Sequence, residues 1–182
     1  MAIGLLVLRV IVGLLFVGHG TQKLFGWFGG HGPEGTAAFL GSLGYRPSRT
    51  MALVAGVTET LAGAMLALGF LTPVASAAII GVMVNATMAM HLRNGLWNSN
   101  GGFELPLVYA TVAAGLAFAG PGRWSVDRLI GFIPDPILAG LGAIALGAVA
   151  GVIALATRER EMAPASLGRT ESARESESAR AA

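Results

Sequence analysis

The sequence has no cysteine in its 182 residues. This absence excludes disulfides, thiol nucleophiles, iron–sulfur clusters held by thiolates and covalently attached c-type haem. We therefore expect no covalent haem and no iron–sulfur cluster. Any redox chemistry has to come from a bound cofactor or from a partner protein.

Charged residues are also scarce. They make up 12% of the chain, whereas about a quarter is usual in soluble domains. Ten of them lie from Arg158 onward, which leaves twelve for the first 157 residues. The chain is 54% hydrophobic, with a mean hydropathy of +0.68. The sequence pI of about 9.7 does not indicate nucleic-acid binding, because the arginines are scattered rather than clustered. We expect no nucleic acid among the partners.

Long apolar windows are what the sequence does contain. A helix that spans a bilayer needs about 20 apolar residues. Five windows approach this length, at 2–25, 51–71, 73–91, 101–119 and 137–156. The sequence therefore predicts an all-α integral membrane bundle with the lipid bilayer as its surroundings. The Leu71-Thr72-Pro73 junction marks a tight helix stop and restart.

The segments outside these windows differ in character. The loop at 26–50 is rich in glycine and carries aromatic residues, which favour the membrane interface, so we expect it along the headgroups. The tail at 158–182 has almost no hydrophobic residues, and such a composition predicts disorder.

Orientation follows from the distribution of lysine and arginine between the two ends of the bundle. Five spans place only Arg123 and Arg128 at one end. The other end carries Lys23, Arg46, Arg49, Arg93, Arg158, Arg160 and Arg169. We therefore expect a multi-pass protein whose C-terminal tail is cytoplasmic.

The last window contains small residues spaced four apart, at Ala143, Gly147 and Gly151. Such a ridge lets two helices approach closely. It indicates either packing within the bundle or a homo-oligomer formed through this helix.

Polar groups inside the spans are the candidate functional residues, because they are costly in lipid and tend to face the bundle interior. They are Arg9, His19, Lys23, Glu59, Asn85, His91 and Glu104. On a helix, Arg9, His19 and Lys23 fall within roughly an 80° arc, so they line one side of the first span. Arg9 and Lys23 lie close enough to the helix ends to snorkel to the interfaces instead.

Glu59 is the most informative of these residues. It lies well inside the second span, between Gly56 and Gly63, which leave room for a second helix or a ligand. In lipid its carboxyl group has to be protonated or paired with a cation such as Arg9, Lys23 or a protonated histidine. A functional carboxylate and a structural ion pair are both compatible with this pattern.

His91 and Glu104 lie near the ends of neighbouring spans, across the polar loop at 92–102. They could meet at one mouth of the bundle or be hydrated end residues. No two of the histidines and glutamates in the spans have close ligand spacing, so we expect no metal site.

These residues lie in motifs that together resemble the DoxX family of small bacterial membrane proteins. The segment GHGTQKLFG closes the first span at 18–26, and Glu59 precedes an LGFLTP ending. Asn85 and His91 occupy the third span, and GGFE opens the fourth at 101–104, before GPGRWSVD at 120–127. The resemblance covers about residues 1–132. It implies a four-helix core, with an additional transmembrane helix at 133–157, in the bacterial inner membrane.

The resemblance also implies membrane redox work, because members include a quinone-linked oxidoreductase subunit and components of complexes with soluble redox enzymes. The leading hypothesis is therefore a quinone-linked oxidoreductase component. Glu59 and His19 would relay protons to a quinone, and Lys23 would stabilise its negative charge. Asn85, His91, Glu104 and Arg9 are candidates for binding. The alternatives are a non-catalytic scaffold for soluble redox partners and a small proton-coupled transporter.

Overall fold

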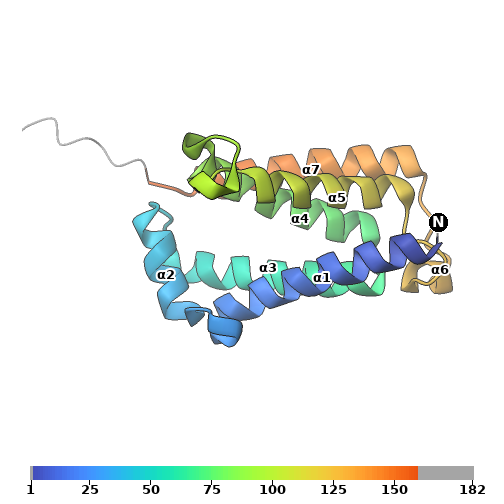
Figure 1. Ribbon diagram of the computed structural model, residues 1–182, viewed down its shortest axis with the longest axis horizontal. Helices are drawn as coiled ribbons and strands as arrows, with labels where there is room; N and C mark the ends of the chain where they lie inside the picture. Colours follow the sequence, from blue (N-terminus) through green and yellow to red (C-terminus); the bar gives the residue numbers. More distant parts are fainter. Residues whose placement is uncertain (1, 160–182) are drawn as a thin grey trace, which may run out of the picture.

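The computed structural model describes residues 2–159, which form an antiparallel helical bundle (Figure 1). The tail predicted to be disordered spans residues 158–182, of which 160–182 lie outside the described residues. Arg158 and Glu159 are described, and they donate hydrogen bonds to the carbonyl oxygens of Leu43 and Gly44. The α-helices are α1 (Ala2–Phe25), α2 (Gly32–Ser42), α3 (Ser48–Leu68), α4 (Thr72–Ala86), α5 (Glu104–Ala119), α6 (Val126–Ile130) and α7 (Pro136–Ala156). A π-helical turn at Thr87–His91 and a 3-10 turn at Leu92–Asn94 extend α4.

Four predicted spans are confirmed as helices long and apolar enough to cross a membrane. They are α1, α3, α7 and α4 with its extension to Asn94. The fifth, α5, is apolar but has only 16 residues, about 24 Å of helix. It runs beside the others along the bundle (Figure 1). The all-helical membrane fold predicted from the sequence is therefore confirmed, with one short span.

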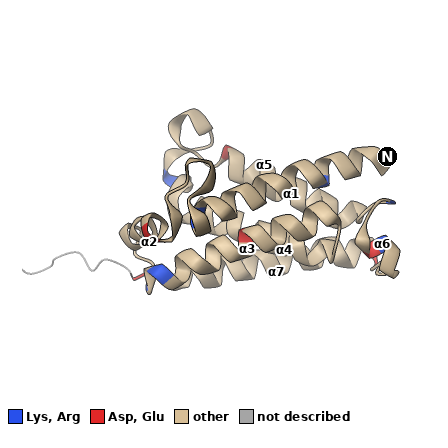
Figure 2. Ribbon diagram, turned by 90° about the horizontal axis from the view of Figure 1, so that it is seen from below, with Lys and Arg blue, Asp and Glu red and all other residues tan. Residues whose placement is uncertain are grey.

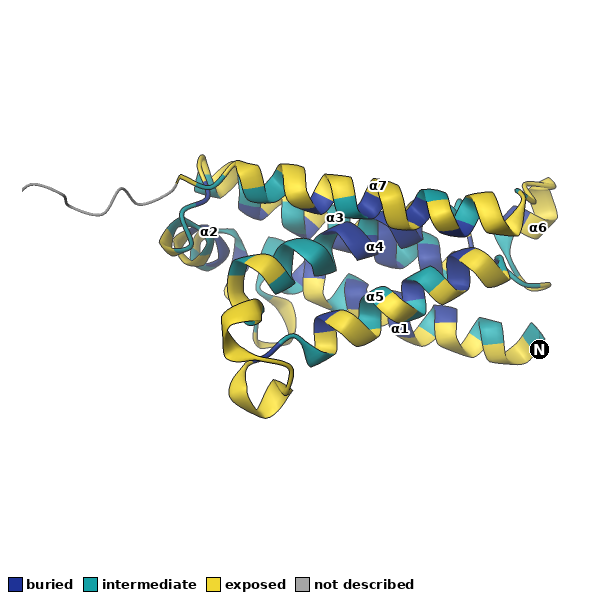
Figure 3. Cartoon of the chain, turned by 90° about the horizontal axis from the view of Figure 1, so that it is seen from above, coloured by how far each residue is buried: buried dark blue, intermediate teal, exposed yellow. Residues whose placement is uncertain are grey.

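The outer faces of the bundle are apolar, as a bilayer solvent requires. Leu14, Leu61 and Leu146 are 58%, 57% and 68% exposed. Figure 3 shows buried residues confined to the surfaces between helices, and Figure 2 shows most charged residues near the two ends. Large exposed hydrophobic residues in this pattern face lipid tails rather than water.

Glycines set the distance between α1 and α3. A Cβ atom added to Gly13 would lie 2.5 Å from the carbonyl oxygen of Gly63, and one added to Gly20 would lie 2.6 Å from the backbone nitrogen of Thr60. The two backbones therefore touch, as small residues permit in membranes. This close contact brings side chains of α1 directly onto α3.

The small-residue ridge of α7 packs inside the bundle, against α4. A Cβ atom added to Gly147 would lie 2.6 Å from the carbonyl oxygen of Ala77, and one added to Gly151 would lie 2.7 Å from that of Gly81. Ala143 is also buried. The ridge therefore packs within the bundle, which is the first of the two interpretations of this pattern. In this arrangement α4 covers the face of α7 that carries the ridge.

The turn between α3 and α4 is held by Asp127 of α6. Leu71 has a positive φ of 45°, which is unusual for a residue with a side chain. Its N–H donates to Asp127 Oδ1 at 2.6 Å, while the N–H and hydroxyl of Thr72 donate to Oδ2 at 2.9 and 2.7 Å. The helix stop predicted at Thr72-Pro73 is therefore correct, and a distant carboxylate fixes its geometry.

The loop at 26–50 is more ordered than its sequence indicates. It contains α2, which lies across the end of the bundle and packs on α3 and α1 (Figure 1). Thr36 and Ala37 are its buried contacts. The glycines of this segment weaken helix propensity, whereas Pro33 stands in the first turn, where proline is tolerated. Packing therefore contributes more to this helix than local preference does.

Candidate functional site

The candidate site is an ion pair between α1 and α3. Lys23 Nζ lies 2.5 Å from Glu59 Oε2, and the Glu59 side chain is only 6% exposed. The Lys23 side chain is 30% exposed, so the pair can be approached from the lysine side. The prediction that Glu59 faces inward toward a cation is confirmed, and that cation is Lys23.

The direction of the Lys23 side chain follows from helix geometry. Side chains on a helix tilt toward its N-terminus, which for Lys23 is toward the interior of the bundle. Its Nζ also donates to the carbonyl oxygen of His19 at 3.5 Å. Lys23 therefore reaches inward to Glu59, and the alternative that it snorkels to the interface is wrong.

Small residues make the pairing possible. Gly56, one turn before Glu59, receives the Leu24 side chain, whose atoms lie within 2.8 Å of an added Cβ position. The hydroxyl of Thr60 donates a hydrogen bond of 2.8 Å to the carbonyl oxygen of Gly56, so it does not compete with Lys23 for the Glu59 carboxylate. The expected room beside Glu59 is thus filled by α1.

A pocket of about 320 Å³ lies beside Lys23, beneath α2. Gln22, His31, Thr36 and Phe39 line it together with Lys23. The pocket therefore borders the ion pair through Lys23, while Glu59 is not part of its lining.

His19 does not contact Glu59. Its side chain is exposed on α1, one turn before Lys23, and its ring lies edge-on to Phe16 at 6.4 Å. Phe16 packs in turn against Tyr109 of α5, at 5.3 Å. His19 therefore sits on the lipid-facing side of the segment that carries Lys23.

Arg9 belongs to the opposite end of the bundle. Its guanidinium donates to the carbonyl oxygens of Pro121 and Trp124, and its Nε donates to that of Ala67 at 3.2 Å. Arg9 is 2% exposed, so it does not snorkel. The structure thus separates Arg9 from the Lys23–Glu59 pair.

The remaining predicted site residues make separate contacts. Asn85 accepts a hydrogen bond from Tyr45 at 2.8 Å and donates to the carbonyl oxygen of Gly151 at 3.3 Å. His91 Nδ1 lies 2.7 Å from the carbonyl oxygen of Gly101, and Glu104 accepts from the N–H of Asn98 at 2.9 Å. His91 and Glu104 thus shape the loop between α4 and α5. Within residues 2–159, no three His, Asp or Glu side chains are grouped as a metal site.

Sequence reasoning missed two buried polar residues that organise the bundle. Asp127 is 1% exposed and Tyr45 is 2% exposed. Asp127 stands in the segment at 120–127 that carries the family resemblance, which was the available signal. Tyr45 had no comparable signal, because its partner Asn85 lies 40 residues away.

Comparisons with known proteins agree with this architecture. A family model described as DoxX matches residues 4–92. The uncharacterized membrane protein Rv3486 of Mycobacterium tuberculosis is 30% identical over 131 residues, which cover 66% of this chain and 77% of that protein. The inner membrane protein YphA of Escherichia coli is 30% identical over 133 residues, covering 68% and 88%.

A third relative carries a functional name. The Bacillus subtilis protein named "Putative oxidoreductase CatD" is 34% identical over 91 residues, which cover 50% of this chain and 62% of that protein. No solved structure matches the chain.

The fold and the buried pair define a multi-pass helical membrane protein with charges enclosed between its spans. The chain belongs to the DoxX family.

Proposed function

We propose that this protein is a membrane oxidoreductase subunit that works with a quinone from the lipid phase. The observation that carries the proposal is the Lys23–Glu59 pair, 2.5 Å apart and nearly enclosed between α1 and α3. Enclosed ionisable groups within membrane spans are costly and often belong to proton or substrate pathways. The name of the Bacillus subtilis relative supports redox work of this kind.

The residues around the pair fit a quinone, which takes up two electrons and two protons on reduction to a quinol. Glu59 is an acid that can give up or accept a proton, and Lys23 supplies positive charge next to it. His19 lies on the outer face of α1, where a molecule approaching from the lipid would meet it. Positioned acids and bases of this kind typically accelerate proton transfer.

Protons can reach the pair through the pocket beneath α2. Its lining includes Gln22, His31 and Thr36 besides Lys23. Glu59 is only 6% exposed, whereas Lys23 contacts both the carboxylate and the pocket. Protons exchanged between the pocket and Glu59 therefore pass by way of Lys23. In the proposed reaction, protons enter from this end and leave on the quinol.

We place the source of electrons in a partner, because the chain has no cysteine to hold an iron–sulfur cluster or a covalent haem of its own. We propose a soluble redox protein that docks at the end of the bundle formed by α2 and the α4–α5 loop. Trp97 of that loop is 61% exposed, and His91 and Glu104 hold the loop in shape. This proposal makes the chain one subunit of a redox complex.

Quinone binding can be tested by photolabelling. The full chain in lipid nanodiscs is illuminated with an azido-substituted ubiquinone analogue, and labelled peptides are mapped by mass spectrometry. We expect label on the α1 segment at 16–23, displaced by unlabelled quinone and strongly reduced in Lys23→Met. Label spread evenly over lipid-facing helices, without displacement, would reject the quinone site.

Turnover tests the role of Glu59. Quinol formation is followed in membranes that contain the chain, with the host's soluble fraction as the source of reductant. Glu59→Gln should lower the rate by about 100-fold, the lower range for a lost proton donor. Glu34→Gln is the matched control, because Glu34 is an exposed acid paired with Arg49 at 3.1 Å. Equal rates in both variants would reject the proposed proton transfer.

A further inference from the structure

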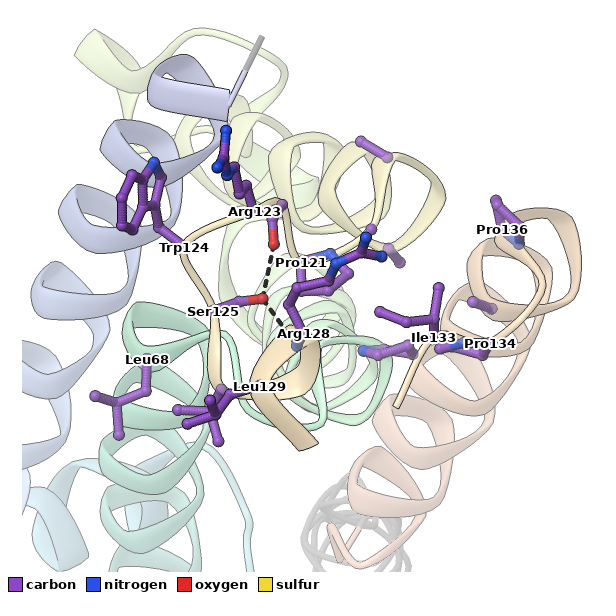
Figure 4. Close-up of a pocket in the computed structure, with 17 residues that line it drawn as sticks. Leu68, Pro121, Arg123, Trp124, Ser125, Arg128, Leu129, Ile133, Pro134 and Pro136 are labelled. Atoms are coloured by element: carbon purple, nitrogen blue, oxygen red, sulfur yellow. Dashed lines mark hydrogen bonds between the residues drawn. The ribbon is translucent and has the colours of Figure 1, made fainter. Parts of the chain in front are cut away.

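A pocket at the end of the bundle opposite the ion pair has no part in the proposed reaction. It measures about 1160 Å³ and is lined by the end of α5, the connection at 120–125, α6 and the start of α7 (Figure 4). We call it the end pocket. Its volume exceeds the roughly 300–1,000 Å³ of ordinary small-molecule sites, so it can take a large amphipathic ligand.

Two buried charges hold the wall of the end pocket in place. Arg9 binds the carbonyl oxygens of Pro121 and Trp124, which both line the pocket. Asp127, in α6, binds the start of α4 through Leu71 and Thr72. Because buried charges are costly unless they are well paired, this connection is strongly fixed rather than a loose loop. The pocket is therefore formed before any ligand arrives.

The charge of the end pocket is positive. Its lining includes Arg123 and Arg128 but no aspartate or glutamate. Both arginines are exposed, and Figure 4 shows Arg128 extending past Pro121 while Arg123 lies beside Trp124. The nearest acids are already engaged: Asp127 at the start of α4, and Asp135 with the N–H groups of Ile137 and Leu138.

The surface around the end pocket is apolar, which points to the lipid as the source of the ligand. Leu129 and Leu138 are 85% and 72% exposed, and Ile133 on the pocket wall is 51% exposed. Trp124, also on the wall, is 62% exposed, and tryptophan is enriched at the membrane interface. Arginines above an apolar surface match a phosphate above its acyl chains.

We propose that the end pocket binds an anionic phospholipid, with its phosphate at Arg123 and Arg128 and its acyl chains along Ile133 and α7. This proposal is independent of the quinone reaction. Near an anionic lipid surface each arginine favours binding by about fivefold. The two arginines together should give a clear preference for phosphatidylglycerol over phosphatidylcholine.

The test uses Trp124 as the probe. In the full chain carrying Trp27→Phe and Trp97→Phe, Trp124 is the remaining tryptophan. Its fluorescence is measured in bilayers containing brominated phosphatidylglycerol or brominated phosphatidylcholine at the same mole fraction. We expect brominated phosphatidylglycerol to quench Trp124 more strongly than brominated phosphatidylcholine does. The ratio of the two quenching values is the readout, so that a direct effect of Arg123 on Trp124, 5.8 Å from its ring, cancels.

Arg123→Gln with Arg128→Gln should bring this ratio close to one, whereas Arg128→Lys alone should keep most of the preference. Arg46→Gln with Arg49→Gln is the control, because it removes the same charge from exposed residues at the other end of the bundle. An unchanged ratio in the pocket variant would overturn the proposal.

Discussion

Tyr45 donates a hydrogen bond of 2.8 Å to Asn85, and this bond ties the α2–α3 connection to α4. Asn85 also binds the carbonyl oxygen of Gly151 in α7, so three parts of the chain meet here. Replacing Tyr45 with Phe leaves the amide oxygen of Asn85 without its donor. We expect thermal unfolding of the purified protein to show a loss of about 1 kcal/mol.

The stability that Tyr45 contributes to the folded protein depends on pH. Burial raises the pKa of Tyr45, while the hydrogen bond to Asn85 and the charge of Arg158 partly oppose that shift. The stabilisation is therefore fully present below about pH 10, the ordinary tyrosine pKa, and is lost as pH rises toward the pKa in the folded protein. The stability difference between the wild type and Tyr45→Phe should shrink above that pH. A difference that grows there would contradict this assignment.

Asp127 and Asp135 cap two helices in different surroundings. Asp127 is buried and accepts three hydrogen bonds at the start of α4, so Asp127→Asn should cost about 3 kcal/mol, since asparagine replaces one acceptor by a donor. Asp135 is exposed and accepts from two N–H groups of α7. Asparagine caps a helix as well as aspartate does, so Asp135→Asn should leave the melting temperature nearly unchanged. Equal losses in the two variants would be inconsistent with the buried network.

Gly13 and Gly18 of α1 give a matched pair for helix packing. An added Cβ at Gly13 would lie 2.5 Å from the carbonyl oxygen of Gly63, whereas nothing lies within 4 Å of one at Gly18. Gly13→Ala should therefore lose about 1–3 kcal/mol by overpacking, and Gly18→Ala should lose nothing. The unfolding free energies of both variants measure the contact between α1 and α3.

Gly147 and Gly142 test where the ridge of α7 packs. Gly147 contacts α4, while an added Cβ at Gly142 meets nothing within 4 Å. Gly147→Leu should lower the unfolding temperature of the bundle, and Gly142→Leu should not. If Gly147→Leu instead left the stability intact and only separated a dimer, as seen by size-exclusion chromatography with light scattering, the ridge would be an interface between copies.

The spans could be predicted from the sequence because their apolar length is a local property. The helix stop before Pro73 and the inward direction of Glu59 follow equally from local rules, namely turn chemistry and the cost of a charge in lipid. The helix α2 could not be predicted, since Gly32–Ser42 has weak helical preference and its packing partners lie on α1 and α3.

The candidate site was predicted only in part. The arc predicted for Arg9, His19 and Lys23 puts them on one side of α1. In the structure Arg9 binds at one end of the bundle, Lys23 binds at the other end, and His19 is exposed. His91 and Glu104 are at the same end as Lys23, but each binds the backbone of its own loop. Spacing along one helix shows which residues share a face, and it cannot show which residue on another helix each will meet. The proposed roles of these residues in binding and catalysis stay predictions.

The most direct test of the whole account is a double-mutant cycle on Lys23 and Glu59. Unfolding free energies are measured for the wild type, Lys23→Met, Glu59→Gln and the double variant in the same lipid. Removing one member of a buried pair typically costs about 3–5 kcal/mol, because its partner stays charged and unpaired. We expect each single variant to lose stability and the double variant to recover part of the loss. Strictly additive losses would show that the two side chains do not interact, and the proposed site would have no basis.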